Sequence, residues 1–184
     1  MKSTSIETYT GQMIDVADPN PNKINLNDIA HALSNICRYS GHCKSFYSVA
    51  EHCVLGSFLI EEPLVKMFLL HDASEAYLND LSRPLKTILP KYKSLEDVFS
   101  YVIYERFLGK QPTKEEKKKI KHVDDQMLLL EAHELMPSKG SGWSEKWTDH
   151  AGIPRRVSIQ NWNPGTAKRK YEKRIQEVYD GNGV

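Results

Sequence analysis

The residues best suited to chemistry lie in segment 71–80, HDASEAYLND, which directly follows the apolar run 67–70. An imidazole and a carboxylate at adjacent positions in the middle of a buried helix are costly to remove from water. A divalent cation is the simplest partner that compensates for both, because neutral imidazole and carboxylate oxygen are good ligands for transition metals. We therefore expect His71 and Asp72 to bind a metal ion. Glu75 follows His71 by four residues and should project from the same helix face, one turn further on.

Two ligands do not hold a catalytic metal, and neighbouring helices supply further candidates. His52 lies within the apolar segment 49–54, a setting in which its ring can point inward, and Asp124 precedes the apolar run 127–130. The neighbouring Asp125 competes for the same role. Together these residues predict a mixed nitrogen and oxygen site with room for water. Such a site can lower the pKa of a bound water or polarise a phosphoryl oxygen.

Each of these residues also has a purely structural interpretation. His52 taken alone is more often a hydrogen-bonded core histidine, and His71 with Asp72 fits an intrahelical pair equally well. Asp124 alone fits an exposed charge. The metal site is favoured by the joint pattern, in which Glu75 and Asp80 follow the pair at fixed offsets, Asp80 in the loop that ends the helix.

Helical periodicity and end signals predict an all-α protein that forms a single domain over residues 1–184. Residues 1–26 are polar and turn-rich, strand patterns are weak throughout, and 137–165 is an irregular segment rich in Gly, Ser, Pro and Trp that includes Trp143, Trp147 and Trp162. The helical core spans about 28–135, and a loop and final helix occupy 137–184. The expected helices cover 27–37, capped by Asn27 or Asp28, then 48–60, 64–78, 94–108, 112–135 and 166–179, with 79–84 as a loop.

Composition narrows the class of protein. The 184 residues carry a formal net charge of +1, so no global field recruits nucleic acid or an anionic membrane. Segment 114–119 interleaves acidic and basic residues, as a solvated helix face does, and does not indicate a nucleic-acid patch. The apolar runs are too short to span a bilayer, the N-terminus lacks the apolar region of a secretory signal, and three cysteines without a CxxC motif indicate reduced thiols. We expect a cytoplasmic protein with no membrane partner.

The pattern His, His-Asp, Asp resembles the HD-domain phosphohydrolase superfamily, whose members place these ligands on a helical bundle. The resemblance covers roughly residues 28–135 and is closest to small hydrolases of deoxynucleotides from bacteria and phages. The matching segments are Arg38-Tyr39, 48–52, 71–75, Asp80 and 84–86.

This resemblance implies roles for individual residues. It implies that His52, His71, Asp72 and Asp124 bind one divalent metal ion, with Co, Mn, Zn or Fe as candidates and Mg as a further one. It implies that Glu75 orients or activates the attacking water and that Asp80 assists near the leaving group. It places an Arg and an aromatic residue, here Arg38 and Tyr39, against the nucleotide, although relatives commonly carry Trp at the aromatic position.

Phosphate binding needs cations besides the metal, because the overall charge supplies none. Lys86, shortly after Asp80, is the best candidate, and Arg38 is next. His42 follows Gly41 at a break in the chain near the expected site and is a candidate phosphate contact, although a turn role fits it as well.

The expected function is hydrolysis of a deoxynucleoside triphosphate of the dATP type, with release of deoxynucleoside and triphosphate. A 5′-deoxynucleotidase that removes phosphate from monophosphates shares the same ligands, and a non-catalytic nucleotide-binding module is a third alternative. The absence of a GYP sequence after the His-Asp pair disfavours a cyclic-dinucleotide phosphodiesterase. Small bundles of this kind often self-associate, so we expect a homo-oligomer that binds a deoxynucleotide substrate.

Overall fold

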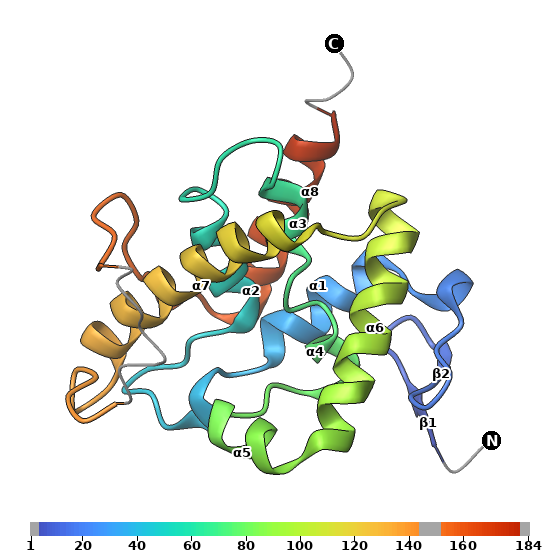
Figure 1. Cartoon of the computed structure of the whole chain (residues 1–184), viewed down its shortest axis with the longest axis horizontal. Coiled ribbons are helices and arrows are strands. Elements are labelled where there is room, and N and C mark those ends of the chain that lie inside the picture. The colour runs from blue at the N-terminus through green and yellow to red at the C-terminus, as the bar shows by residue number, and fades with distance from the viewer. Residues whose placement is uncertain (1–3, 144–151, 181–184) are drawn as a thin grey trace.

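The computed structural model describes residues 4–143 and 152–180. These residues form eight α-helices and one small antiparallel hairpin (Figure 1), so the chain is mainly helical, as the sequence predicts. The elements are β1 Ser5–Glu7, β2 Met13–Asp15, α1 Leu26–Asn35, α2 Val49–Gly56, α3 Val65–Leu69, α4 Glu75–Leu78, α5 Arg83–Ile88, α6 Pro90–Leu108, α7 Lys114–Leu135 and α8 Pro164–Asp180. Short 3-10 turns occupy Pro21–Lys23 and Tyr39–Gly41.

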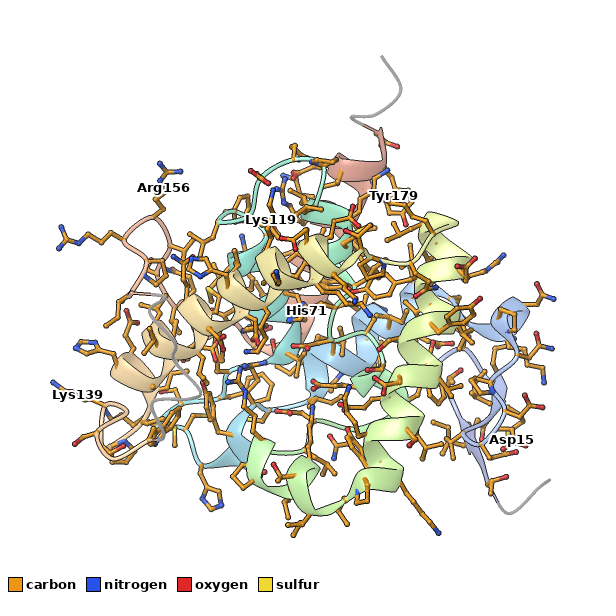
Figure 2. The ribbon with its side chains drawn as sticks, viewed as in Figure 1. Asp15, His71, Lys119, Lys139, Arg156 and Tyr179 are labelled. Atoms are coloured by element: carbon orange, nitrogen blue, oxygen red, sulfur yellow. The ribbon has the colours of Figure 1, made fainter. Side chains whose placement is uncertain are left out.

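The helices pack around a shared apolar core. Helix α8 packs against α1, α2 and α3, α6 contacts α3, α4 and α5, and α7 lies across α2 (Figure 1). Leu33, Phe68, Phe99 and Tyr171 are fully buried where these helices meet. Figure 2 shows His71 among the helices, beside α7, whereas Lys139, Arg156 and Asp15 lie at the periphery.

The N-terminal segment contains regular structure that the sequence does not predict. Strands β1 and β2 pair antiparallel, with Ile6 opposite Ile14 and a turn at Gly11, whose φ of 77° suits glycine. Each strand has three residues, too few for alternation to stand out from a polar background. The buried Ile14 side chain ties the hairpin to the core.

The N-cap of helix α1 lies two to three residues before the expected caps, Asn27 and Asp28. The Asn25 side chain accepts a hydrogen bond from the Asp28 backbone N–H at 2.9 Å and is the true N-cap. Asp28 is instead buried inside the helix, where its carboxylate accepts bonds from the Thr8 hydroxyl at 2.8 Å and the Thr10 N–H at 2.7 Å. It fastens the hairpin to α1, a long-range role that local spacing cannot reveal.

The helices that flank the candidate site start where the sequence predicts. The Ser48 hydroxyl caps α2 by accepting a bond from the Glu51 N–H at 3.1 Å. Thr113 and Glu116 form a reciprocal capping box at the start of α7. These local interactions fix the first residue of each helix. The position of His52 in α2 and of Asp124 in α7, counted from that residue, then sets the side of the helix on which each side chain lies.

The single helix expected over 64–78 is wrong. The structure has α3, then tight turns through residues 70–74, then α4. The backbone N–H groups of His71, Ala73 and Glu75 bond to carbonyls three residues earlier rather than four. The His71 ring also binds the Phe68 carbonyl through Nδ1 at 2.6 Å, so this carbonyl accepts two bonds from His71 in a tight 3-10-type turn.

The loop expected over 79–84 and the helix start expected near Ser94 also need correction. Helix α5 already begins at Arg83, and α6 begins at Pro90. Pro84 and Pro90 look like helix breakers in the sequence, but each lies in the first turn of a helix, where the missing N–H has no intrahelical partner in any case.

Residues 137–143 and 152–163 contain turns and extended chain but no helix or strand, as expected for this segment, and Trp147 lies outside the described residues. The buried Glu51 carboxylate holds the second part, because it accepts bonds from the N–H groups of Gln160, Asn161 and Trp162 at 2.7–3.0 Å. Helix α8 then begins and ends within two residues of its expected bounds.

None of the helices in the described residues is long and apolar enough to cross a membrane.

The contact between α2 and α3 predicts a packing effect at Gly56. A Cβ atom at this position would overlap the buried Phe68 ring and crowd the Met127 side chain. We expect Gly56→Ala to lower the free energy of unfolding by about 1–3 kcal/mol, the usual cost of overpacking a core. Gly165→Ala, where the added atom meets only ordinary contacts, should change it by less than about 0.5 kcal/mol. Urea denaturation of both variants measures the difference, and equal stabilities would contradict this description of the interface.

Candidate metal centre

Three of the predicted ligands meet in one cluster that could hold a metal ion. His52 comes from α2, and His71 and Asp72 come from the turns between α3 and α4. The two Nε2 atoms are 3.4 Å apart, and Asp72 Oδ2 lies 3.2 Å from Nε2 of His71 and 3.7 Å from Nε2 of His52. Donors that share an ion through bonds of about 2.0–2.2 Å lie roughly 3 Å apart. The spacing therefore suits a single small cation.

The fourth predicted ligand faces the same cluster from α7. Asp124 Oδ1 lies 3.5 Å from His52 Nε2, while its Oδ2 accepts bonds from Arg83 at 3.0 Å and Lys121 at 3.2 Å. Asp125 binds Arg83 at 3.0 Å and also pairs with Lys121. The Asp124 carboxylate faces His52, whereas the Asp125 carboxylate faces Arg83 and Lys121, so the geometry favours Asp124 as the ligand.

The hydrogen bonds of His71 direct one ring nitrogen into the cluster. Its Nδ1 contacts the Phe68 carbonyl oxygen at 2.6 Å, and a carbonyl can only accept, so Nδ1 carries the proton. Burial lowers the pKa of His71, which favours the neutral ring. A neutral ring protonated on Nδ1 leaves a lone pair on Nε2, the atom that faces His52 and Asp72.

His52 is oriented in the same way by a carboxylate. Its Nδ1 lies 2.6 Å from Glu131 Oε1, and both side chains are fully buried. Although burial alone would raise the pKa of Glu131, the charge of Arg38 and the contacts with His52 and Tyr39 lower it to about 2. The ionised carboxylate can only accept, so His52 donates from Nδ1 and directs its Nε2 lone pair toward His71.

The donor set therefore combines two imidazole nitrogens with two carboxylates. Burial opposes the charge of Asp72 and Asp124, but positive charge on the adjacent imidazoles, together with Arg38, lowers both pKa values below the ordinary range. The carboxylates thus favour positive charge at the imidazole nitrogens, and a metal ion supplies it in place of protons. A divalent cation satisfies all four groups at once, and the residues present fit one.

Arg38 and Tyr39 connect this centre to the adjoining pocket. The Arg38 guanidinium binds Glu131 through Nε at 3.1 Å and Asp72 through Nη1 at 3.4 Å. Burial alone would lower the pKa of Arg38, but the two carboxylates raise it, so the charge persists. The Tyr39 hydroxyl donates to Glu131 Oε2 at 2.6 Å, in a turn where Tyr39 has a φ of 58°.

Glu75 lies beside the ligand cluster, in the same pocket as Asp72. It is only 4% exposed, and its Oε1 pairs with Lys86 at 3.2 Å. Burial, with the charges of Asp72 and Asp80, raises the pKa of Glu75 well above its ordinary value. Its Oε2 is buried without a hydrogen-bond partner among the described residues. The raised pKa makes the ionised Glu75 carboxylate a stronger base toward a bound molecule.

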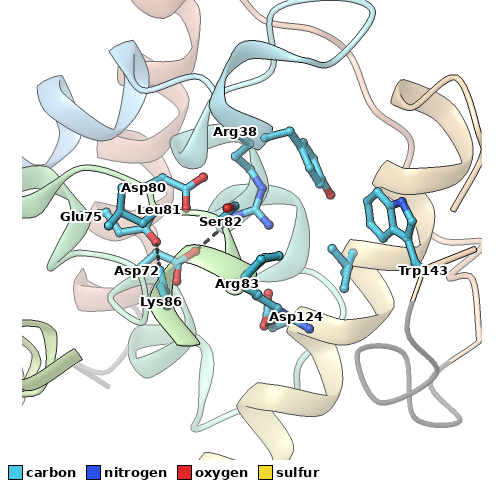
Figure 3. A pocket seen from close by; sticks show the side chains of 13 residues that line it. Arg38, Asp72, Glu75, Asp80, Leu81, Ser82, Arg83, Lys86, Asp124 and Trp143 are labelled. Atoms are coloured by element: carbon cyan, nitrogen blue, oxygen red, sulfur yellow. Dashed lines mark hydrogen bonds and ion pairs between the residues drawn. The ribbon is translucent and has the colours of Figure 1, made fainter. Parts of the chain in front are cut away.

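These groups line a pocket of about 230 Å³ (Figure 3). Its polar part contains Asp72, Asp124 and the predicted residues Glu75, Asp80 and Lys86. Arg38 and Tyr39 also line it, and the remaining lining residues are Leu81, Ser82, Arg83, Pro84, Leu128 and Trp143.

His42 is the predicted contact that the structure does not bring to the pocket. It is exposed and absent from the lining, and its backbone N–H closes the 3-10 turn on the Tyr39 carbonyl at 2.9 Å. The turn role weighed for this residue is the one that it has.

A second opening reaches the cluster from the side of α6 and α7. Two adjoining cavities of about 380 and 550 Å³ both include His71 and Asp124 in their lining. Lys93 and Lys121 line both cavities, and Lys117 lines the larger one. The approach to the cluster on this side therefore carries lysines, of which Lys93 is paired with Asp97 and Lys121 with Asp124.

Sequence reasoning missed Glu131, which binds Arg38, Tyr39 and His52 at the centre. A signal was present, since Glu131 follows Asp124 by seven residues, two helical turns, and interrupts the apolar pattern after Met127 and Leu130. It also missed Glu96, which pairs with Lys86 at 2.7 Å. That contact joins α5 to α6 and depends on a helix start that the sequence does not indicate.

Comparison with known proteins identifies two relatives, and no family model matches the chain. The chain is 41% identical over 138 residues to the uncharacterized protein YfdR of Escherichia coli, an alignment that covers 75% of this chain and 76% of that protein. It is 32% identical over 176 residues to the uncharacterized protein RCAP_rcc00048 of Rhodobacter capsulatus, covering 87% and 85% respectively.

The bond between His52 and Glu131 predicts a loss of metal affinity when the carboxylate is removed. In Glu131→Gln the amide has no negative charge to fix the imidazole or to balance Arg38, and we expect the affinity for Mn²⁺ or Zn²⁺ to fall about 10–100-fold. Isothermal titration calorimetry measures the affinity, with circular dichroism as the check on folding. Glu134→Gln, an exposed change less than one turn further along α7, is the matched control and should bind as the wild type does. Equal affinity in the two variants would contradict the orienting role of Glu131.

Proposed function

The chain belongs to the same family as YfdR of Escherichia coli, and we propose that it is an HD-domain phosphohydrolase that acts on deoxynucleotides. The observation that carries the proposal is the convergence of His52, His71, Asp72 and Asp124 beside a buried, partly unsatisfied Glu75. This combination of a mixed nitrogen and oxygen donor set with an adjacent proton acceptor suits hydrolysis of a phosphate ester.

A divalent ion held by His52, His71, Asp72 and Asp124 would neutralise charge on the phosphoryl oxygens and favour deprotonation of water. Glu75 Oε2, the oxygen without a partner, accepts the proton from the water that attacks phosphorus. The bond from water oxygen to phosphorus forms as the bond from phosphorus to the 5′ oxygen breaks. Asp80, which lines the same pocket, assists departure of the 5′ oxygen, the leaving group of this reaction.

The basic residues in this account hold the anionic substrate. Arg38 is fixed by Glu131 with its Nη1 directed at Asp72, so a positive group adjoins the cluster. Lys86 on α5 lies between Glu75 and Glu96 and provides a second basic group in the pocket. Both side chains are held by carboxylates before substrate binds, which lowers the entropic cost of ordering them.

A triphosphate substrate is our preferred version. The lysine-lined cavities on the side of α6 and α7 share His71 and Asp124 with the cluster, and they provide space for phosphates beyond the one attacked.

The alternative, a monophosphatase, is supported by a different observation. Arg83, Lys86 and Lys121 are already paired with carboxylates, which leaves less positive charge for a long phosphate chain.

A substrate screen separates these versions. Purified protein is incubated with each deoxynucleoside mono- and triphosphate in the presence of Mn²⁺, Co²⁺, Mg²⁺ or Zn²⁺, and the phosphate products are identified. We expect triphosphate and deoxynucleoside from at least one triphosphate. Orthophosphate released from monophosphates alone would replace the triphosphohydrolase with the 5′-deoxynucleotidase, and no product from any nucleotide would contradict the phosphohydrolase.

Glu75 separates an enzyme from a non-catalytic nucleotide-binding module. We expect Glu75→Gln to lower kcat by about 10²–10⁴-fold, the usual contribution of a positioned acid or base. Metal binding should persist, because Glu75 is not a member of the ligand cluster. Steady-state kinetics measures the effect, and Glu115→Gln on the exposed face of α7 is the control. Unchanged turnover in Glu75→Gln would contradict the catalytic role.

A further inference from the structure

The two ends of the pocket differ in chemistry. One end carries the charged groups of Asp72, Glu75 and Lys86, and the other carries Trp143, whose ring lies near that of Tyr39. Figure 3 shows Trp143 across the pocket from Glu75 and Asp80. A pocket of this kind suits a ligand with a phosphate at one end and a flat apolar group at the other.

The chain after α7 folds back to bring Trp143 to the pocket. Lys139, Gly140 and Gly142 have φ values of 52°, 82° and 82°, and these left-handed residues reverse the chain. The Trp143 N–H then closes a turn on the Gly140 carbonyl at 3.1 Å. A Cβ at Gly140 would lie 3.2 Å from that of Ala132, so the turn is packed against α7.

Trp143 meets a ring whose position is already fixed. The ring centroids of Tyr39 and Trp143 are 5.9 Å apart, with an interplanar angle of 42°. The Tyr39 hydroxyl is bound to Glu131, the carboxylate that also holds His52. The aromatic end of the pocket therefore has a set position relative to the metal cluster.

We propose that Trp143 is a specificity-determining residue that binds the nucleobase of the substrate by stacking, an inference that rests on the proposed function. Aromatic rings accept any base by its π face, so the site selects nucleotides over phosphate esters that lack a base. The stacking surface confers little preference among the four bases. The base lies at the Trp143 end while the phosphate reaches the cluster past Arg38.

Binding without turnover gives the first test. Protein freed of metal with EDTA is titrated with deoxyadenosine 5′-monophosphate or with 2-deoxyribose 5-phosphate, its counterpart without a base, while tryptophan fluorescence is recorded. We expect quenching by the nucleotide only. Trp143→Phe should abolish the change, and Trp162→Phe, located in the segment held by Glu51, should retain it. Equal quenching in the Trp143→Phe protein, or none in the wild type, would overturn the proposal.

Kinetics gives the second test. Trp143→Leu should raise KM for the best nucleotide about tenfold or more, the range measured for loss of one stacked base, with kcat changed less than threefold. Trp143→Phe should stay within threefold of wild-type KM because it keeps a ring. Hydrolysis of the base-free counterpart of that nucleotide, 2-deoxyribose with the same number of 5-phosphates, should be unchanged in both variants, whereas a merely structural role would lower it as well.

The two proposals fail in distinguishable ways. If the wild type hydrolyses nucleotides and Trp143→Leu leaves KM unchanged, the stacking role is wrong and the proposed function stands. If the wild type hydrolyses none, the proposed function is wrong, and the fluorescence titration alone decides whether Trp143 binds a base.

Discussion

The contact between His52 Nδ1 and the Glu131 carboxylate lies wholly out of solvent, and three separate parts of the chain depend on it. Glu131 reaches from α7 to His52 on α2, and the same carboxylate binds Arg38 and Tyr39 from the turn before α2. A buried carboxylate is stable only when such partners offset its lost hydration. The interaction thereby fixes the register of α7 against α2, directs His52 Nε2 inward and sets the aromatic end of the pocket.

The interruption of the chain at residues 70–74 supplies the other half of the centre. A continuous helix would carry His71 and Asp72 about 100° apart around its axis, whereas the tight turns bring the Nε2 and Oδ2 atoms within 3.2 Å. The Phe68 carbonyl accepts both the His71 backbone N–H at 3.2 Å and the His71 Nδ1 proton at 2.6 Å. The same carbonyl therefore takes part in the turn after α3 and selects the tautomer that can ligate a cation. Local structure and site chemistry are coupled at this residue.

Much of the centre can be predicted from the sequence because its residue types are unusual for their surroundings. His71 and Asp72 follow an apolar run, and α7 carries a capping box that fixes the face of Asp124. The remainder depends on partners distant in sequence. Glu131 interrupts the apolar pattern of α7, but its role becomes clear only from its pairing with His52. Helix α5 is concealed by prolines that local rules treat as breakers, and the hairpin is held by Asp28 and the burial of Ile14. His42 shows the converse, since its place at a chain break does not bring it into the pocket lining.

The central claim is that the two inward Nε2 atoms and the Asp72 carboxylate share one ion. Crystals grown with Mn²⁺ or Co²⁺, measured at the absorption edge of that metal, test it directly. We expect an anomalous difference peak about 2.0–2.2 Å from His52 Nε2, His71 Nε2 and Asp72 Oδ2. Clear density for these side chains with no peak between them, or a peak only at surface carboxylates, would contradict a shared ion.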